Sequence, residues 1–132
     1  MKKRRSTMKK ILIGIGVIIG ILAVIIFGIV QITKDWQEPE TIYHDINLQN
    51  IADGTYNGSY IAKPIEVEVA VSVKNNVITD IKILKHSNGR GKDAESITDI
   101  VIKEQSLLVE VISGATASSK SILKAIENAL FK

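Results

Sequence analysis

Apolar residues follow two different patterns along this chain. A continuous run covers residues 11–32, twenty-two positions without a charged side chain. Beyond residue 64 the apolar residues recur at regular intervals, every second position in residues 65–73 and every third or fourth position in residues 93–104 and 121–132. The continuous run predicts a membrane-spanning helix, and the periodic segments predict the strands and helices of a separate domain.

The continuous run has the length of a bilayer core. Twenty-two helical residues extend about 33 Å, against a hydrocarbon thickness of about 30 Å. The basic segment 1–10 before it predicts a cytoplasmic N-terminus, which places the rest of the chain outside the membrane. A cleavable signal peptide is the alternative, but its apolar core has only about 7–15 residues and ends at small residues, which residues 29–33 do not offer. We therefore favour an uncleaved single-pass anchor in the cell membrane.

Residues 33–51 read as a spacer between the anchor and the domain. They are polar, contain Pro39 and show no sustained period. Trp36 lies just past the apolar run, where an aromatic side chain suits the membrane interface. Ile46 and Leu48 fit either a short helix or an edge strand, and the pattern does not choose between them. The domain itself is predicted over residues 52–132.

A β-hairpin is the clearest feature of that domain. Residues 65–73 alternate between apolar and polar side chains, residues 77–84 do so less strictly, and the two Asn residues at 75–76 tolerate the positive φ of a tight turn. An earlier turn dipeptide at residues 57–58, Asn-Gly, precedes a short strand at residues 59–61. An antiparallel hairpin with one apolar face needs helices to cover it.

The remaining elements supply that cover. Residues 93–104 and 121–132 carry apolar stripes at helical spacing, and the β-branched segment 107–112 between them is predicted to be a strand. We therefore expect an α+β fold, a small antiparallel sheet covered by two main helices and preceded by one transmembrane helix.

The overall charge of +3 averages two unlike regions. Residues 1–34 carry seven Lys or Arg and no acidic residue, whereas residues 35–132 carry ten Lys or Arg and fourteen Asp or Glu, a net charge of −4. An acidic domain argues against a nucleic-acid partner, which requires a basic face. Cysteine is absent, so disulfides and thiolate metal sites are excluded.

The first candidate site lies at residues 113–120, Ser-Gly-Ala-Thr-Ala-Ser-Ser-Lys, between the predicted strand and the last helix. Small side chains let a ligand approach the backbone, and a helix N-terminus offers unpaired N–H groups to an anion such as a phosphate. One hydroxyl could also anchor a phosphoester. The simpler interpretation is that Ser118 or Ser119 caps the helix.

The second candidate site is the loop 86–92, which contains two glycines, an Arg and a Lys. N–H groups near Gly89, together with the two cations, could hold a phosphate, or the loop could be a solvated connection. A lone His86 at a strand end more often makes a structural hydrogen bond than donates a proton. No second ligand accompanies it at a useful spacing, so zinc is not indicated, and no catalytic group can be singled out.

Taken together, these segments resemble the FMN-binding domain family, which includes the small extracytoplasmic flavin subunits of the bacterial Na⁺-pumping quinone reductase and Rnf-type complexes. The resemblance rests on the Ser-Gly-Ala-Thr motif with an acid three positions before it, on segment 53–58 and on the loop 86–92, and it covers about residues 52–132. In the family the motif threonine carries FMN through a phosphoester installed by a flavin transferase. One position departs, because Glu110 stands where the family usually has Asp.

The resemblance implies a membrane-anchored extracytoplasmic flavoprotein that relays electrons to or from a membrane redox partner, a reductase or quinone-linked complex. Such a chain is a carrier more than a stand-alone enzyme. The alternative is a flavin-free, membrane-tethered binding, accessory or sensor domain that uses the same loop for an anion or a protein partner. Thr116 is the implied attachment point. The other predicted FMN contacts are Ser113, Gly114, Ala115, Ser118, Ser119, His86 and Gly89.

Overall fold

The computed structural model describes residues 2–42, 44–87 and 91–131. The chain forms two compact units, Met1–Trp36 and Gln37–Lys132. The first unit is dominated by one α-helix, α1 (Lys2–Lys34), whose side chains are all exposed. This helix contains the predicted span and is long and apolar enough to cross a membrane.

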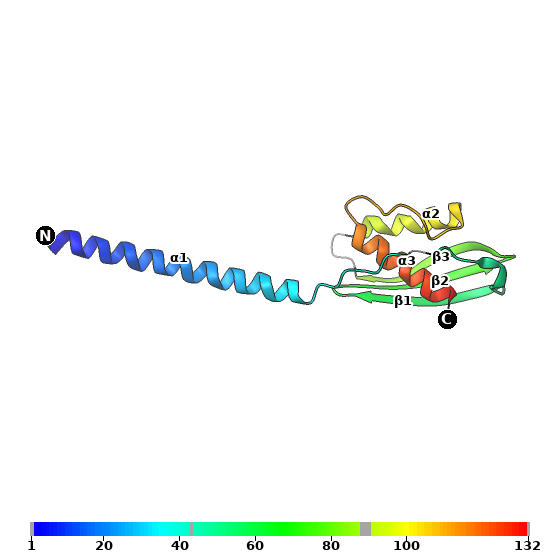
Figure 1. Cartoon of the computed structure of the whole chain (residues 1–132), viewed down its shortest axis with the longest axis horizontal. Coiled ribbons are helices and arrows are strands. Elements are labelled where there is room, and N and C mark those ends of the chain that lie inside the picture. The colour runs from blue at the N-terminus through cyan, green and yellow to red at the C-terminus, as the bar shows by residue number, and fades with distance from the viewer. Residues whose placement is uncertain (1, 43, 88–90, 132) are drawn as a thin grey trace. The chain divides into compact units, whose positions relative to one another are not determined.

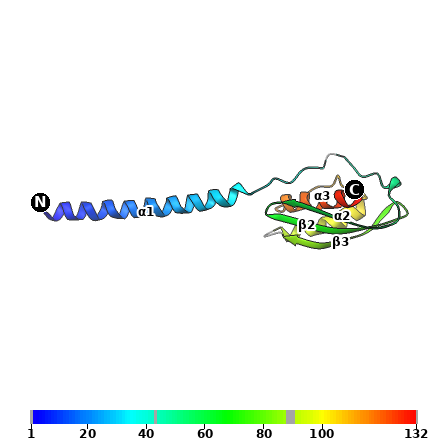
Figure 2. The same cartoon turned by 90° about the horizontal axis from the view of Figure 1, so that it is seen from below.

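The second unit is an α+β domain, as expected (Figure 1). Three strands form an antiparallel sheet in the order β1-β2-β3. Both α-helices lie on one face of this sheet, α3 against β1 and β2, and α2 against β3 (Figures 1 and 2). The elements are η1 (Leu48–Asn50), β1 (Gly54–Ala62), β2 (Ile65–Lys74), β3 (Val77–Ser87), η2 (Lys92–Ser96), α2 (Ile97–Glu104) and α3 (Thr116–Leu130).

The predicted hairpin is confirmed. Strands β2 and β3 pair around a turn in which Asn75 and Asn76 have φ of +51° and +62°. The alternating residues of β2 divide as the pattern predicts, because Val67, Val69 and Val71 are completely buried under the helices. Each buried valine of this kind stabilises the fold by roughly 1.5–3 kcal/mol.

The predicted turn at residues 57–58 is wrong, because this Asn-Gly pair lies in the middle of β1. Gly58 is needed there for packing and not for a turn. A Cβ atom added at Gly58 would overlap backbone atoms of α3, the carbonyl oxygen of Ala125 and the nitrogen and Cα of Ala129. The glycine therefore lets α3 lie directly against the strand.

The predicted strand at residues 107–112 is also wrong, because this segment is an irregular loop. Three of its six N–H groups are bound by side chains in place of a neighbouring strand. Asp45 accepts from the N–H of Leu107, Ser106 accepts from Leu108, and Ser119 accepts from Ile112. These side-chain acceptors satisfy three backbone groups that would otherwise need a neighbouring strand.

Helix boundaries differ from the prediction as well. The final helix begins at Thr116, five residues before the predicted start. The predicted helix 93–104 is confirmed, with its first turn wound as the 3₁₀ helix η2 before α2 begins. The earlier start of α3 moves residues 116–119 from the predicted turn into the helix.

Residues 37–53 pass along the side of the domain, and we call them the strap; residue 43 lies outside the described residues. At one end the Gln37 N–H donates to the carbonyl oxygen of Lys63, and at the other Asp53 accepts from the N–H of Asn75. The segment follows the helical side of the domain between these points (Figure 2). Its apolar residues Ile42, Ile46, Leu48 and Ile51 pack against the hydrophobic core.

Candidate functional site

The candidate site begins with a tight turn that brings the loop 107–112 into α3. The Ala115 N–H donates to the carbonyl oxygen of Ile112 at 3.0 Å. Gly114 has a φ of +78°, which suits glycine, and nothing in the protein would approach a Cβ there within 4 Å. Ser113 and Gly114 are exposed, whereas Ala115 is buried against the core. We call residues 112–116 the flavin turn, after the FMN contacts that the sequence predicts there.

The N-terminus of α3 opens directly onto this turn. The first N–H that bonds within the helix is that of Ser119, which donates to the carbonyl oxygen of Ala115 at 2.9 Å. The preceding N–H groups, those of Thr116, Ala117 and Ser118, have no side-chain cap. Such groups carry the positive end of the helix dipole and bind anions. This end of α3 therefore has the chemistry that suits an anion such as a phosphate.

Thr116 is the exposed hydroxyl of this helix end. Its side chain faces solvent and makes no hydrogen bond with the residues that the structure describes. Ser118 and Ser119 instead face the core, with exposures of 2% and 0%. Among the hydroxyls of the first helical turn, Thr116 is thus the one that an external group can reach.

Ser119 holds the flavin turn against the helix. Its hydroxyl accepts from the N–H of Ile112 at 3.0 Å and donates to the carbonyl oxygen of Ala115 at 2.8 Å. The interpretation of Ser118 or Ser119 as the N-cap is wrong, because Ala115 occupies the capping position. Through these two hydrogen bonds, Ser119 connects Ile112 and Ala115 of the turn to α3.

We expect Ser119→Ala to lower the free energy of unfolding by about 1–3 kcal/mol, because the part-buried N–H of Ile112 loses its acceptor. Ser121→Ala is the matched control. Ser121 is equally buried, but its hydroxyl donates to the carbonyl oxygen of Ala117. This carbonyl already accepts the backbone N–H four residues later in the helix, so it keeps a partner when the hydroxyl is removed. Urea denaturation of both variants measures the difference. Equal losses of unfolding free energy in the two variants would contradict the role of Ser119 in holding the turn.

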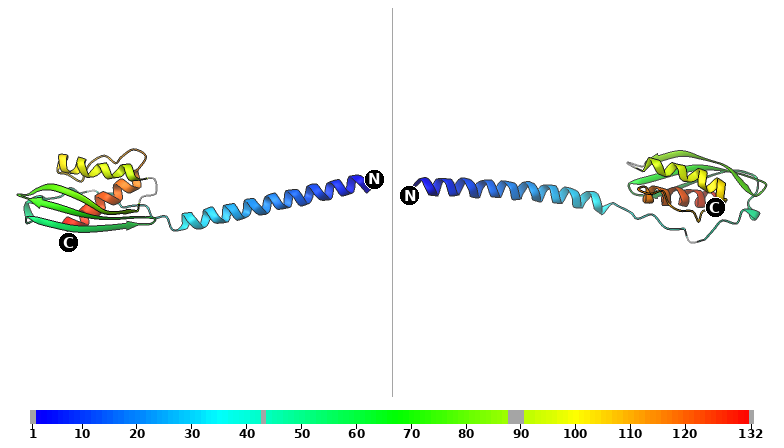
Figure 3. Two further views of the ribbon diagram at one scale, coloured as in Figure 1. Left: turned by 180° about the vertical axis from the view of Figure 1, so that it is seen from behind. Right: turned by 90° about the horizontal axis from the view of Figure 1, so that it is seen from above.

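His86, the first residue of the predicted loop 86–92, lies within strand β3. Its side chain is 2% exposed, and Nδ1 lies 3.0 Å from Oε1 of Glu95 in η2. This contact joins the end of β3 to η2, which in turn contacts α3. The end of β3 and the N-terminus of α3 lie at the same end of the sheet (Figures 1 and 3). Predicted contact Gly89 lies outside the described residues.

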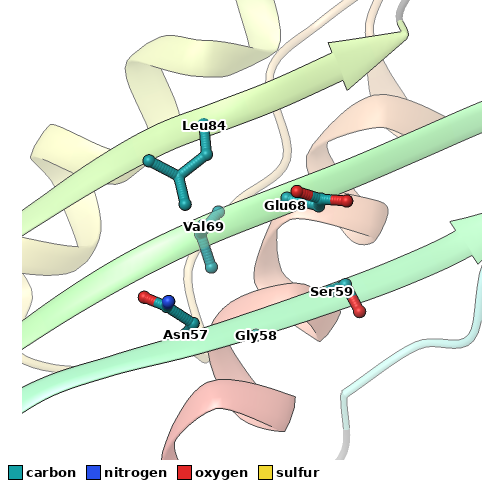
Figure 4. Close-up of a pocket in the computed structure, with 6 residues that line it drawn as sticks. All are labelled: Asn57, Gly58, Ser59, Glu68, Val69 and Leu84. Carbon is teal, nitrogen blue, oxygen red and sulfur yellow. The ribbon is translucent and has the colours of Figure 1, made fainter.

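Two hollows can be compared with this site. One, of about 150 Å³, lies between the strap, the loop 107–112 and α3; it is lined by Thr41, Ile42, Leu107, Leu108, Val109, Val111, Lys120 and Leu123. The other, of about 190 Å³, lies on the sheet face opposite the helices, where Asn57, Ser59, Glu68 and Leu84 surround it (Figure 4). Only the first hollow joins the predicted site, because Lys120 lies one helical turn after Thr116.

Sequence reasoning missed the residues that hold this site from a distance. Asp45 binds the start of the loop 107–112 although more than sixty residues separate them. Lys124 lies between the carboxylates of Glu40 and Glu127, so it ties the strap to α3. Neither residue belongs to a local motif. Single charged positions in polar segments carry no signal of a distant partner.

Comparison with known proteins identifies one family. The model of one protein family, described as FMN-binding domain, matches residues 61–131. No curated protein and no solved structure was found to match the chain. The matched region contains the whole sequence from the end of β1 through α3, including the flavin turn, and it leaves out the strap.

Proposed function

Because the chain belongs to the FMN-binding domain family, we propose that it is a membrane-anchored flavoprotein that carries FMN at the flavin turn and relays electrons. FMN is the cofactor of this family, and the N-terminal helix could span a membrane. The basic residues before the apolar stretch favour a cytoplasmic N-terminus and a domain on the outer side. The chain then serves as a carrier for a redox partner in the same membrane.

One observation carries the location of the site. An exposed threonine hydroxyl and uncapped N–H groups occur together at the start of α3. The N–H groups and the helix dipole suit the dianionic phosphate of FMN. The Thr116 hydroxyl, at the end of the flavin turn, is positioned to replace a phosphate oxygen as the ester oxygen. Ser113 and Gly114 lie exposed beside it, whereas the buried Ser118 offers only its backbone N–H. Ala115 and Ser119 hold the turn through their hydrogen bonds to Ile112.

The protein needs few reactive groups for such a role. FMN supplies the redox chemistry of its isoalloxazine ring, and the chain supplies attachment, position and local polarity. His86, held by Glu95 near the same end of the sheet, is the proposed contact from the second loop. A covalent link through Thr116 would keep the flavin from being lost outside the cell.

The experiment is expression of the full-length chain with and without a flavin transferase, followed by intact mass and in-gel fluorescence after denaturation. We expect a mass gain of one FMN less one water only with the transferase, because a phosphoester forms with loss of water. Colour that disappears on denaturation would instead mean non-covalent FMN and would implicate Glu110. A colourless protein without affinity for FMN would exclude the proposal and favour a flavin-free binding domain.

A further inference from the structure

The loop that leads into the flavin turn is held from outside the family-matched region. Asp45, in the strap, accepts from the hydroxyl of Ser106 at 2.6 Å and from the N–H of Leu107 at 3.0 Å. Leu107 is 1% exposed, so its N–H has little access to water as a substitute acceptor. The carboxylate thus fixes the first residues of the loop 107–112, as Ser119 fixes the last.

The hydrogen bonds also act on the carboxylate itself. Partial burial alone would raise the pKa of Asp45, but the hydroxyl of Ser106 and the N–H groups of Leu107 and Ile46 outweigh this and lower its pKa below 3.8. The carboxylate is therefore ionised at neutral pH, where hydrogen bonds to a charged acceptor are stronger than those between neutral groups.

Other contacts hold the strap against α3. Glu40 forms an ion pair with Lys124 at 3.2 Å, and its N–H donates to the hydroxyl of Tyr60. The Glu127 carboxylate, and then that of Glu40, raise the pKa of Lys124 above 10.5 despite partial burial. Ile42 of the strap lines the 150 Å³ hollow beside the loop and Lys120. The strap therefore contacts both the loop and the helix that frame the flavin turn.

We propose that Asp45 is a positioning residue for FMN attachment, through which the strap fixes the loop 107–112 and so presents the flavin turn. This inference rests on the proposed function. It extends the functional unit beyond the matched region 61–131 to the segment that follows the membrane helix. Loss of the Asp45 carboxylate frees the loop at its start, and the turn then has several orientations where it had one. Fewer chains then present Thr116 correctly.

The test uses the full-length chain in detergent, with Asp45→Ala, Asp45→Asn and the matched control Asp53→Ala. Asp53 anchors the far end of the strap by accepting the N–H of Asn75 at the β2–β3 turn, so this variant tests whether the loss of any strap contact has the same effect. For Asp45→Ala we expect amide hydrogen exchange in residues 106–112 to rise roughly tenfold or more, with β2 still protected. We expect the fraction of FMN-carrying chains, measured by intact mass after co-expression with the transferase, to fall several-fold.

The two other variants distinguish positioning from general stability. Asp45→Asn keeps a carbonyl oxygen that can accept the Leu107 N–H. It should therefore retain much of the wild-type protection against hydrogen exchange and much of the FMN loading. This variant keeps the test possible even where Asp45→Ala does not fold. Asp53→Ala should leave FMN loading unchanged. The inference would be overturned if both Asp45 variants showed wild-type hydrogen-exchange rates and wild-type FMN loading. It would also be overturned if Asp53→Ala lost as much FMN loading as Asp45→Ala. If the wild-type chain takes up no FMN, the proposed function fails, and the exchange rates still decide whether Asp45 fixes the loop.

Discussion

Full-length Thr116→Val, co-expressed with a flavin transferase, should show no fluorescent band after denaturing electrophoresis. Valine keeps the β-branched shape of threonine but has no hydroxyl, so no phosphoester can form. Because the Thr116 side chain is exposed and makes no hydrogen bond with the described residues, we expect the free energy of unfolding to change by less than about 0.5 kcal/mol. The predicted effect is thus complete loss of covalent FMN in a folded protein.

Two further variants make this result specific. Thr116→Ser retains a hydroxyl at the same position and should retain part of the attachment. Ser113→Ala removes a neighbouring exposed hydroxyl that we propose to contact the phosphate, so it should lower the yield of the covalent band without abolishing it. Covalent FMN in Thr116→Val, located by peptide mass spectrometry, would show that another residue carries the flavin and would refute our assignment.

Gly58→Ala should destabilise the domain strongly. The new Cβ would lie 2.7 Å from the Cα of Ala129 and would overlap two further backbone atoms of α3. Backbone atoms cannot rotate away, so α3 must move off the sheet. We expect a loss of at least about 3 kcal/mol from a total of roughly 5–15 kcal/mol, and a fall in Tm of about 12 °C or more.

Ser59→Ala is the control for this prediction. Ser59 is the next residue of β1 and faces away from the helices, on the open side of the sheet (Figure 4). Its substitution should change stability by no more than about 0.5 kcal/mol. Thermal unfolding followed by circular dichroism compares the two variants. A Gly58→Ala protein as stable as the control would mean that α3 does not pack on β1 as closely as the structure has it.

Features with a local origin could be predicted from the sequence. The membrane-length helix follows from an uninterrupted apolar run, and the β2–β3 hairpin follows from alternation around Asn75 and Asn76. The start of the last helix and the state of residues 107–112 could not be predicted in this way. A β-branched run favours a strand, but here Asp45, Ser106 and Ser119 supply the acceptors that a neighbouring strand would have provided.

The candidate site likewise combines features that the local sequence sets with features that contacts between distant residues set. By itself the sequence determined the long apolar helix, the class of fold, the family resemblance and the Ser-Gly-Ala-Thr motif with Thr116, because each depends on residues that are adjacent or regularly spaced in the chain. Only the tertiary structure decided that Thr116 faces solvent while Ser119 is buried, that Gly58 makes room for α3, and that Asp45 holds the loop before the flavin turn. These features depend on contacts between residues far apart in the chain, and no local pattern records which distant groups the fold brings together.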